Sequence, residues 1–129
     1  MNADEMAESN RRILNQPGIY MCYYVEYGSE MIGRLVISKS RDKDKADAGE
    51  IAAMYLLSKF WGKGYGREMM TFSLAELKRV GHEEVLLWVL EANSRARRFY
   101  EKCGFIFDGT RKEINIDAPL IEMRYIRTL

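Results

Sequence analysis

The segment 56–66 reads LLSKFWGKGYG, and Arg67 follows it directly. It continues the apolar stretch EIAAMYLL at 50–57, which favours a β-strand, and it leads into a helical pattern. Glycines at 62, 64 and 66 let the backbone approach a ligand closely. A helix start presents unpaired N–H groups, to which Lys63 and Arg67 add side-chain charge. The segment predicts an anion site suited to a pyrophosphate, with a plain tight turn as the alternative.

Two familiar phosphate loops do not fit this segment. The Walker A pattern needs Lys-Ser or Lys-Thr after its second glycine, and neither pair occurs here. The dinucleotide fingerprint needs a longer second gap than the even spacing of Gly62, Gly64 and Gly66 provides. A nucleotide-binding regulator is therefore a weak interpretation.

The residues before this segment predict one helix and two strands. We expect a helix at 3–15, because apolar residues recur there at helical spacing behind a capping-box pattern. Aromatic and β-branched residues favour strands at 19–27 and 31–38, joined by a short turn. The stretch 40–48 alternates in charge without periodicity and predicts a solvated hairpin loop.

The residues after it predict two helices and three strands. The first helix carries Met70, Leu74 and Leu77 on one face and ends at Gly81. The second begins at Asn93 or Ser94 and ends at Gly104. The expected strands are 84–90, 105–116 and 120–127, the last two joined across Asp117-Ala118-Pro119.

This order of elements predicts a single α/β domain over residues 1–129. Strands 50–57 and 84–90 are joined by a helix, so they should lie parallel with a right-handed crossover. The other neighbouring strands are expected to be antiparallel. The predicted sheet is therefore mixed and mostly antiparallel, with flanking helices.

A second motif lies thirty residues after the first, in VLEANSRARRFYEKCGF at 89–105. It combines Asn93, Ala96, Phe99-Tyr100 and Gly104-Phe105 around the predicted short helix. With both motifs at this separation, residues 19–129 resemble the GNAT superfamily of acyl-CoA-dependent N-acyltransferases. The first motif is similar to that family's pyrophosphate loop, and the second to its asparagine-to-Gly-Phe motif.

The resemblance implies an acetyl-CoA site in which the strands 50–57 and 84–90 splay apart and pantetheine pairs with the first of them. Leu56 and Ser58 would offer backbone groups to pantetheine, with the Leu56 N–H facing the thioester oxygen. Asn93 would bond the cofactor from the other side. The full set of implied cofactor-binding residues is Leu56, Leu57, Ser58, Trp61, Gly62, Lys63, Gly64, Tyr65, Gly66, Arg67, Asn93 and Tyr100.

The resemblance also implies an N-acetyltransferase that moves an acetyl group to a primary amine by direct attack in a ternary complex. Tyr100 matches the family's tyrosine that donates a proton to the leaving thiolate, although a core tyrosine is the alternative. Glu50 stands where some members place a glutamate that draws the amine's proton through water. A solvated strand-start residue is the alternative for Glu50.

This chain departs from the family pattern in two ways. Trp61 stands where the family usually has glutamine or arginine, but that position offers mainly backbone groups. The family's first strand and helix, which shape the acceptor pocket, have no counterpart in the sequence. A non-catalytic acetyl-CoA-binding module, such as a sensor or partner subunit, therefore stays the alternative function.

The missing strand would leave 19–27 at a sheet edge. Its Tyr20, Tyr23, Tyr24 and Tyr27 are expected to pack that strand rather than line an acceptor pocket. An exposed edge recruits other strands, so we expect a homodimer rather than a helix folded over the edge.

Composition excludes several other classes of protein. The 129 residues are 47% hydrophobic and 30% charged with a net charge of +1, which predicts neither a nucleic-acid footprint nor a membrane span. Without a secretory signal, we expect a cytoplasmic protein. Cys22 and Cys103 lack metal-ligand spacing, and the only histidine, His82, has no nearby ligand partner. We therefore expect no metal site. We expect the Cys103 thiol to be packed and His82 to be structural.

Overall fold

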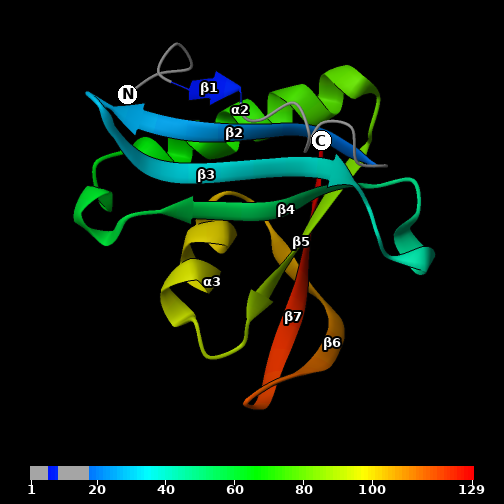
Figure 1. Cartoon of the computed structure of the whole chain (residues 1–129). Helices are drawn as coiled ribbons and strands as arrows, with labels where there is room; N and C mark the ends of the chain where they lie inside the picture. Colours follow the sequence, from blue (N-terminus) through cyan, green and yellow to red (C-terminus); the bar gives the residue numbers. More distant parts are fainter. Residues whose placement is uncertain (1–5, 9–17) are drawn as a thin grey trace.

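The computed structural model describes residues 6–8 and 18–129 and forms one mixed sheet with two helices (Figure 1). The described strands form a seven-stranded sheet in the order β1-β2-β3-β4-β5-β7-β6. Their bounds are β1 Met6–Glu8, β2 Ile19–Tyr27, β3 Glu30–Lys39, β4 Gly49–Leu56, β5 Glu84–Leu90, β6 Ile106–Ile116 and β7 Ala118–Thr128. The predicted mixed, mostly antiparallel α/β fold is confirmed.

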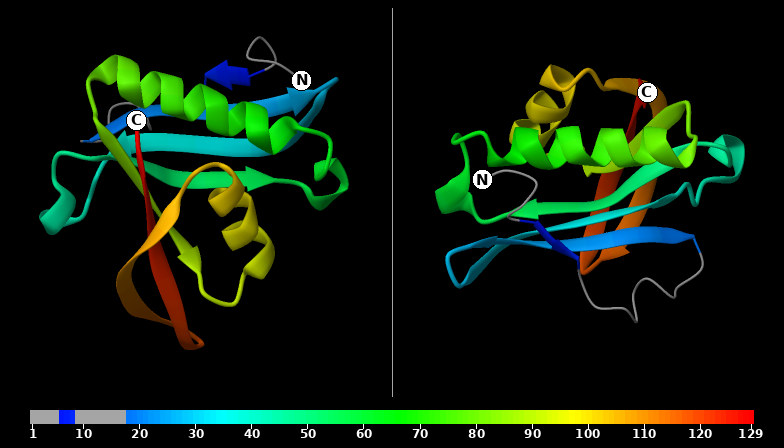
Figure 2. Two further views of the ribbon diagram at one scale, coloured as in Figure 1. Left: turned by 180° about the vertical axis from the view of Figure 1, so that it is seen from behind. Right: turned by 90° about the horizontal axis from the view of Figure 1, so that it is seen from above.

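Both α-helices, α2 (Tyr65–Val80) and α3 (Ser94–Lys102), cover the same face of the sheet (Figure 2). We call this the helix face and the opposite one the far face. Alternate residues of each strand point to opposite faces, and those on the helix face form the buried core with Met69, Met70 and Leu77 of α2. Gly81 ends α2 in the left-handed conformation, as the sequence predicts. No described helix is long and apolar enough to cross a membrane.

The parallel pair β4 and β5 separates soon after it begins. The two strands pair only at Gly49–Val85 and Glu50–Leu86. Beyond that point β4 remains paired with β3 alone, and its register against β3 shifts by one residue at Ala52. A bulge of this kind bends a strand and increases its twist, which carries the end of β4 away from β5 (Figure 1).

The N-terminal predictions need correction. Residues 6–8 form strand β1, which pairs antiparallel with Tyr23–Val25 of β2, so the expected helix is wrong there. The remaining residues of 3–15 lie outside the described part of the chain. The expectation that β2 is an uncovered edge is wrong at Tyr23–Val25, where β1 pairs with it.

The stretch 40–48 is a structured loop rather than a merely solvated one. It contains the 3₁₀ turn η2 (Lys43–Lys45), and two of its aspartates contact the almost fully buried Arg124 of β7. Asp42 and Asp44 accept hydrogen bonds from Arg124 at 3.1 and 2.7 Å, and Asp108 accepts another at 2.7 Å. A buried guanidinium needs such partners, and their identity depends on tertiary contacts that charge alternation does not reveal.

The structure also describes the closing hairpin, the histidine and the two cysteines. The closing hairpin turns at Asp117, which has a φ of 62°, and Ala118 and Pro119 already belong to β7. His82 is structural, since its ring nitrogens contact the Tyr20 hydroxyl at 2.9 Å and the Asp47 carbonyl at 2.8 Å. Cys22 is buried and Cys103 is half-buried, and both are free thiols.

Candidate active site

A cavity of about 730 Å³ lies where β4 and β5 separate. Its wall includes consecutive residues of the same strand, such as Met54 and Tyr55 of β4 and Trp88 and Val89 of β5. Neighbouring residues of a strand point to opposite faces of the sheet. The cavity therefore passes through the sheet, from the helix face to the far face.

The start of α2 forms one wall of this cavity. Gly64 is its N-cap residue, with a φ of 89° and no side chain to accept hydrogen bonds from the first turn. Gly62, with a φ of 75°, Gly64 and Gly66 all line the cavity. The first N–H groups of α2 are thus left for a ligand, and the helix dipole favours a negatively charged one.

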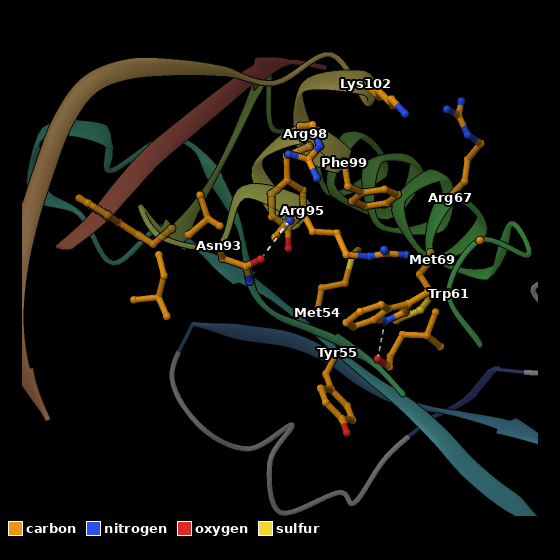
Figure 3. A pocket seen from close by; sticks show the side chains of 18 of the residues that line it. Met54, Tyr55, Trp61, Arg67, Met69, Asn93, Arg95, Arg98, Phe99 and Lys102 are labelled. Carbon is orange, nitrogen blue, oxygen red and sulfur yellow. Dashed lines mark hydrogen bonds between the residues drawn. The ribbon is translucent and has the colours of Figure 1, made fainter. Parts of the chain in front are cut away.

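The start of α3 forms the facing wall and is built differently. Asn93 caps this helix, because its Oδ1 accepts a hydrogen bond from the Ala96 N–H at 3.1 Å. Its Nδ2 donors have no partner among the described residues, and Asn93 lines the cavity (Figure 3). Asn93 therefore stabilises the helix with one atom and can serve a ligand with another.

Basic side chains gather at the helix-face end of the cavity. Arg67 of α2 and Arg95, Arg98 and Lys102 of α3 line it, and Figure 3 shows Arg67, Arg98 and Lys102 near one another, with Tyr55 at the opposite end. The Arg95 guanidinium stacks 4.3 Å from the centre of the Trp61 ring. Four cations around one end of a cavity favour a ligand with several phosphates.

The end of β4 presents a free backbone donor to the cavity. The Leu57 N–H donates to the Ile32 carbonyl on β3 at 2.8 Å, so the Leu56 N–H and carbonyl point away from β3. The Trp61 Nε1–H donates to the Leu56 carbonyl at 2.8 Å, which fixes the indole beside the glycine loop. The Leu56 N–H has no strand partner on that side, because β5 has already separated.

Tyr100 projects from α3 into the cavity beside Phe99 and Phe105. Within the described residues its hydroxyl has no hydrogen-bond partner. Burial, with a smaller contribution from the nearby Cys103 thiol, raises the pKa of Tyr100 to about 12. The phenol is therefore protonated at neutral pH and is placed to act as a proton donor.

Glu50 is buried but does not line the cavity. Its Oε1 accepts a hydrogen bond from the Arg41 N–H at 3.0 Å, and its Oε2 accepts from the Arg41 guanidinium. This pairing raises the pKa of Arg41 above its usual value. Because the carboxylate is engaged away from the cavity wall, a base role for Glu50 would need water to carry the proton.

The cavity brings together most of the residues expected to bind a cofactor. Those that line it are Leu56, Trp61, Gly62, Gly64, Gly66, Arg67, Asn93 and Tyr100. Four of the expected residues do not line it: Leu57 and Ser58 at the start of the turn η3 (Ser58–Phe60), Lys63 of the glycine loop, and Tyr65, the first residue of α2. The tyrosines of β2 also lie outside the cavity wall, in keeping with a packing role.

Sequence reasoning missed the basic residues of α3 and the lining residues of the far face. Arg95, Arg98 and Lys102 recur at helical spacing of three and four, a pattern that places them on one side of α3. That signal was available in the sequence. The sequence does not reveal that Trp88 and Glu122 lie together, because their proximity depends on strand pairing between β5 and β7.

Comparison with known proteins identifies the family. The sequence model of the "Acetyltransferase (GNAT) family" matches residues 2–105. The chain belongs to the GNAT family. This match includes the glycine loop, α2 and α3 up to Phe105, and therefore most of the helix-face wall of the cavity.

Two relatives of this GNAT protein share about a third of their aligned residues with it, and both are longer chains. An uncharacterised N-acetyltransferase of Mycobacterium bovis is 33% identical over 85 residues, which are 66% of this chain and 52% of that protein. A mycothiol acetyltransferase of Propionibacterium freudenreichii is 32% identical over 68 residues, or 53% of this chain and 22% of that protein. The chain thus spans about half the length of the mycobacterial relative.

Solved structures show the same fold over the whole described sheet. An acetyltransferase of Bacillus subtilis in complex with CoA superposes with a TM-score of 0.72 at 16% identity, covering 97% of this chain and 98% of that one. A GNAT family acetyltransferase of Elizabethkingia anophelis with acetyl-CoA bound gives 0.71 at 14% identity, covering 96% and 97%. At these identities the likeness concerns the fold alone.

Proposed function

We propose that this GNAT protein transfers an acetyl group from acetyl-CoA to a primary amine. The observation that carries the proposal is the cavity that crosses the sheet between β4 and β5. Its helix-face end has the cations and free N–H groups that a phosphorylated cosubstrate needs, and its other end opens on the far face. Two substrates can therefore meet inside it from opposite sides.

Acetyl-CoA as the cosubstrate is supported by the fit of the residues and by the neighbours of the same fold that hold CoA or acetyl-CoA. The first turn of α2 and Arg67 would hold the pyrophosphate, and the Asn93 Nδ2 would donate from the other wall. The Leu56 N–H would pair with pantetheine or stabilise the oxyanion that forms at the thioester carbonyl. The cavity is thus lined by Asn93, by the uncapped start of α2 and by the Leu56 N–H.

The chemistry requires two proton transfers. The amine must lose a proton to attack, because an ammonium has no lone pair. As the new C–N bond forms and the C–S bond breaks, the Tyr100 hydroxyl would give its proton to the departing thiolate. Burial raises the pKa of this phenol to about 12, so it holds the proton at neutral pH but is a weaker acid than an ordinary tyrosine. The base role of Glu50 stays a prediction, as do a cytoplasmic location, a two-fold dimer and a reaction that needs no metal.

Release of free thiol from acetyl-CoA in the presence of a panel of primary amines tests the proposal. Thiol release that depends on the amine, together with the acetylated amine detected by mass spectrometry, is the expected result. Acetyl-CoA with the protein but without an amine, and acetyl-CoA with each amine but without the protein, are the controls. Binding of acetyl-CoA without thiol release from any amine would instead support the non-catalytic module.

A further inference from the structure

A cluster of three side chains, Lys112, Trp88 and Glu122, lies on the far face beside the cavity. The Lys112 Nζ lies 4.0 Å from the centre of the Trp88 ring and 3.6 Å from the Glu122 Oε1. Trp88 and Glu122 line the cavity, whereas Lys112 is not part of its wall. The primary ammonium of Lys112 is therefore already held by an aromatic face and a carboxylate at the cavity mouth.

The fold holds this cluster in place. Lys112 and Glu122 are direct cross-strand partners on β6 and β7, and Glu122 pairs with Leu90 of β5. The Trp88 Nε1–H donates to the Asp42 Oδ2 at 3.0 Å, which fixes the indole plane. Nearby Arg124 is paired with three aspartates, so its charge does not cancel the attraction of this cluster for a cation.

Charge divides the cavity into two ends. Its described lining residues include four cations, Arg67, Arg95, Arg98 and Lys102, all from α2 and α3. Among those same residues, Glu122 is the only carboxylate, and it lies on the far face. The helix-face end thus favours an anion and the far-face end a cation, which suits a phosphorylated donor and an amine acceptor.

We propose that Trp88 and Glu122 form the subsite for an ammonium group of the acceptor, and that Lys112 occupies this subsite in the free protein. The proposal rests on the proposed acetyl transfer. The acceptor's ammonium displaces Lys112 and loses its proton to water before the neutral nitrogen attacks the thioester. Exposed Tyr55 and half-buried Leu90 provide apolar walls for the carbon chain behind it. The substrate class is accordingly a primary amine that is cationic at neutral pH, in preference to a neutral aromatic amine.

Steady-state kinetics at saturating acetyl-CoA test the subsite with benzylamine, which is cationic at neutral pH, and aniline, which is neutral. Glu122→Gln should raise the KM of benzylamine by about tenfold, or about 1.4 kcal/mol. Lys112→Met removes the internal competitor and should lower that KM by about two- to fivefold, as expected for a partly exposed ion pair. The KM of aniline and the thermal shift caused by acetyl-CoA should not change.

Lys59→Met is the matched control, because Lys59 also pairs with a glutamate, Glu30, but lies outside the cavity wall. It should leave both KM values unchanged. A benzylamine KM that is the same in Glu122→Gln as in the wild type would overturn the proposal.

A binding measurement separates this proposal from the proposed activity. In a Trp61→Phe background Trp88 is the remaining tryptophan, so its fluorescence reports on the subsite. Benzylammonium chloride should quench it saturably, at lower concentrations when Lys112→Met is also present. If no amine releases thiol, saturable quenching still supports the ammonium site while acetyl transfer fails. Absence of saturable quenching in the Lys112→Met protein would overturn the site itself.

Discussion

The two helices that begin at the cavity contribute to it in different ways. The N-cap residue of α2 is Gly64, with a φ of 89° and no side chain to cap the helix, so α2 offers backbone N–H groups. The N-cap residue of α3 is Asn93, whose side chain accepts from the Ala96 N–H, and α3 offers side chains to the cavity instead. Those that line the cavity are Arg95, Ala96, Arg98, Phe99, Tyr100 and Lys102.

The two helix starts suit two different requirements of the proposed reaction, binding of the pyrophosphate and donation of a proton. A pyrophosphate needs several donors at fixed positions, and a glycine-rich backbone can supply them close to the chain. A proton donor must reach a particular atom, which a long side chain on a rigid helix can do. The first N–H groups of α2 thus have no side-chain cap, whereas Asn93 satisfies one N–H group of α3.

Tyr100→Phe tests the side-chain contribution of α3 and should have the largest effect. It keeps the ring that packs beside Phe99 and Phe105 but removes the proton. Turnover should fall by roughly tenfold to ten-thousandfold, the range for a lost general acid. The thermal shift caused by acetyl-CoA should be retained. Tyr24→Phe, outside the cavity wall, is the control and should turn over like the wild type.

The pH dependence sharpens this test. Because burial raises the pKa of Tyr100 to about 12, the phenol keeps its proton as the pH rises, and its contribution is lost only near that value. The ratio of wild-type to Tyr100→Phe turnover should therefore stay constant up to about pH 10, where an ordinary tyrosine would be half ionised. A ratio that halves by pH 10 would mean that Tyr100 is solvated during turnover.

Gly64→Asp tests the backbone contribution of α2. At acetyl-CoA concentrations about 100 times its dissociation constant, binding should stabilise the wild type by roughly 2.7 kcal/mol. Aspartate adds bulk and negative charge where the pyrophosphate is expected, so most of that gain should disappear; Gly66→Asp should act likewise. Thermal unfolding with and without acetyl-CoA measures it.

The control for Gly64→Asp is Gly28→Asp. Gly28 also has a positive φ, 64°, and open space around it, but it lies in the turn between β2 and β3. Both variants share the strain of a side chain in the left-handed region. An equal acetyl-CoA shift in the two variants would mean that the start of α2 does not hold the cosubstrate.

Glu50→Gln tests a residue that contacts neither helix start. The glutamine keeps an acceptor for the Arg41 N–H but loses the ion pair, so we expect about 1–3 kcal/mol less stability in urea unfolding. The acetyl-CoA shift should be unchanged. Turnover measured on fully folded protein decides the base prediction: a loss of about tenfold or more would support it, and wild-type turnover would remove Glu50 from the mechanism.

The sequence predicted the two helix starts well because their signals are local. Glycine at alternate positions and an asparagine before RARRFY each report on the few residues around them. The far-face end of the cavity was not predicted, because Trp88, Glu122 and Lys112 meet only through the pairing of β5, β7 and β6. Strand β1 was predicted as helix because a strand of three residues is too short to show the alternating apolar pattern of a strand.

Substitutions of Asn93 are expected to have the smallest effect, and they distinguish its role as helix cap from its proposed role in binding the cosubstrate. Asn93→Ala removes the cap of α3 and should cost about 1 kcal/mol of stability without acetyl-CoA. Asn93→Asp keeps an oxygen that can accept from the Ala96 N–H, and aspartate caps as well as asparagine, so its stability should match the wild type. Both variants lose the Nδ2 donors.

If Asn93 also binds the cosubstrate, both variants should show a smaller acetyl-CoA shift, by about 1 kcal/mol for one lost hydrogen bond, and more in the aspartate because of its charge. Thermal unfolding of three proteins, each with and without acetyl-CoA, gives both quantities in one experiment. A full shift in Asn93→Asp would confine Asn93 to the helix cap. In that case only α2 would bind the cosubstrate through its helix start, and α3 would bind it through the side chains that follow its cap.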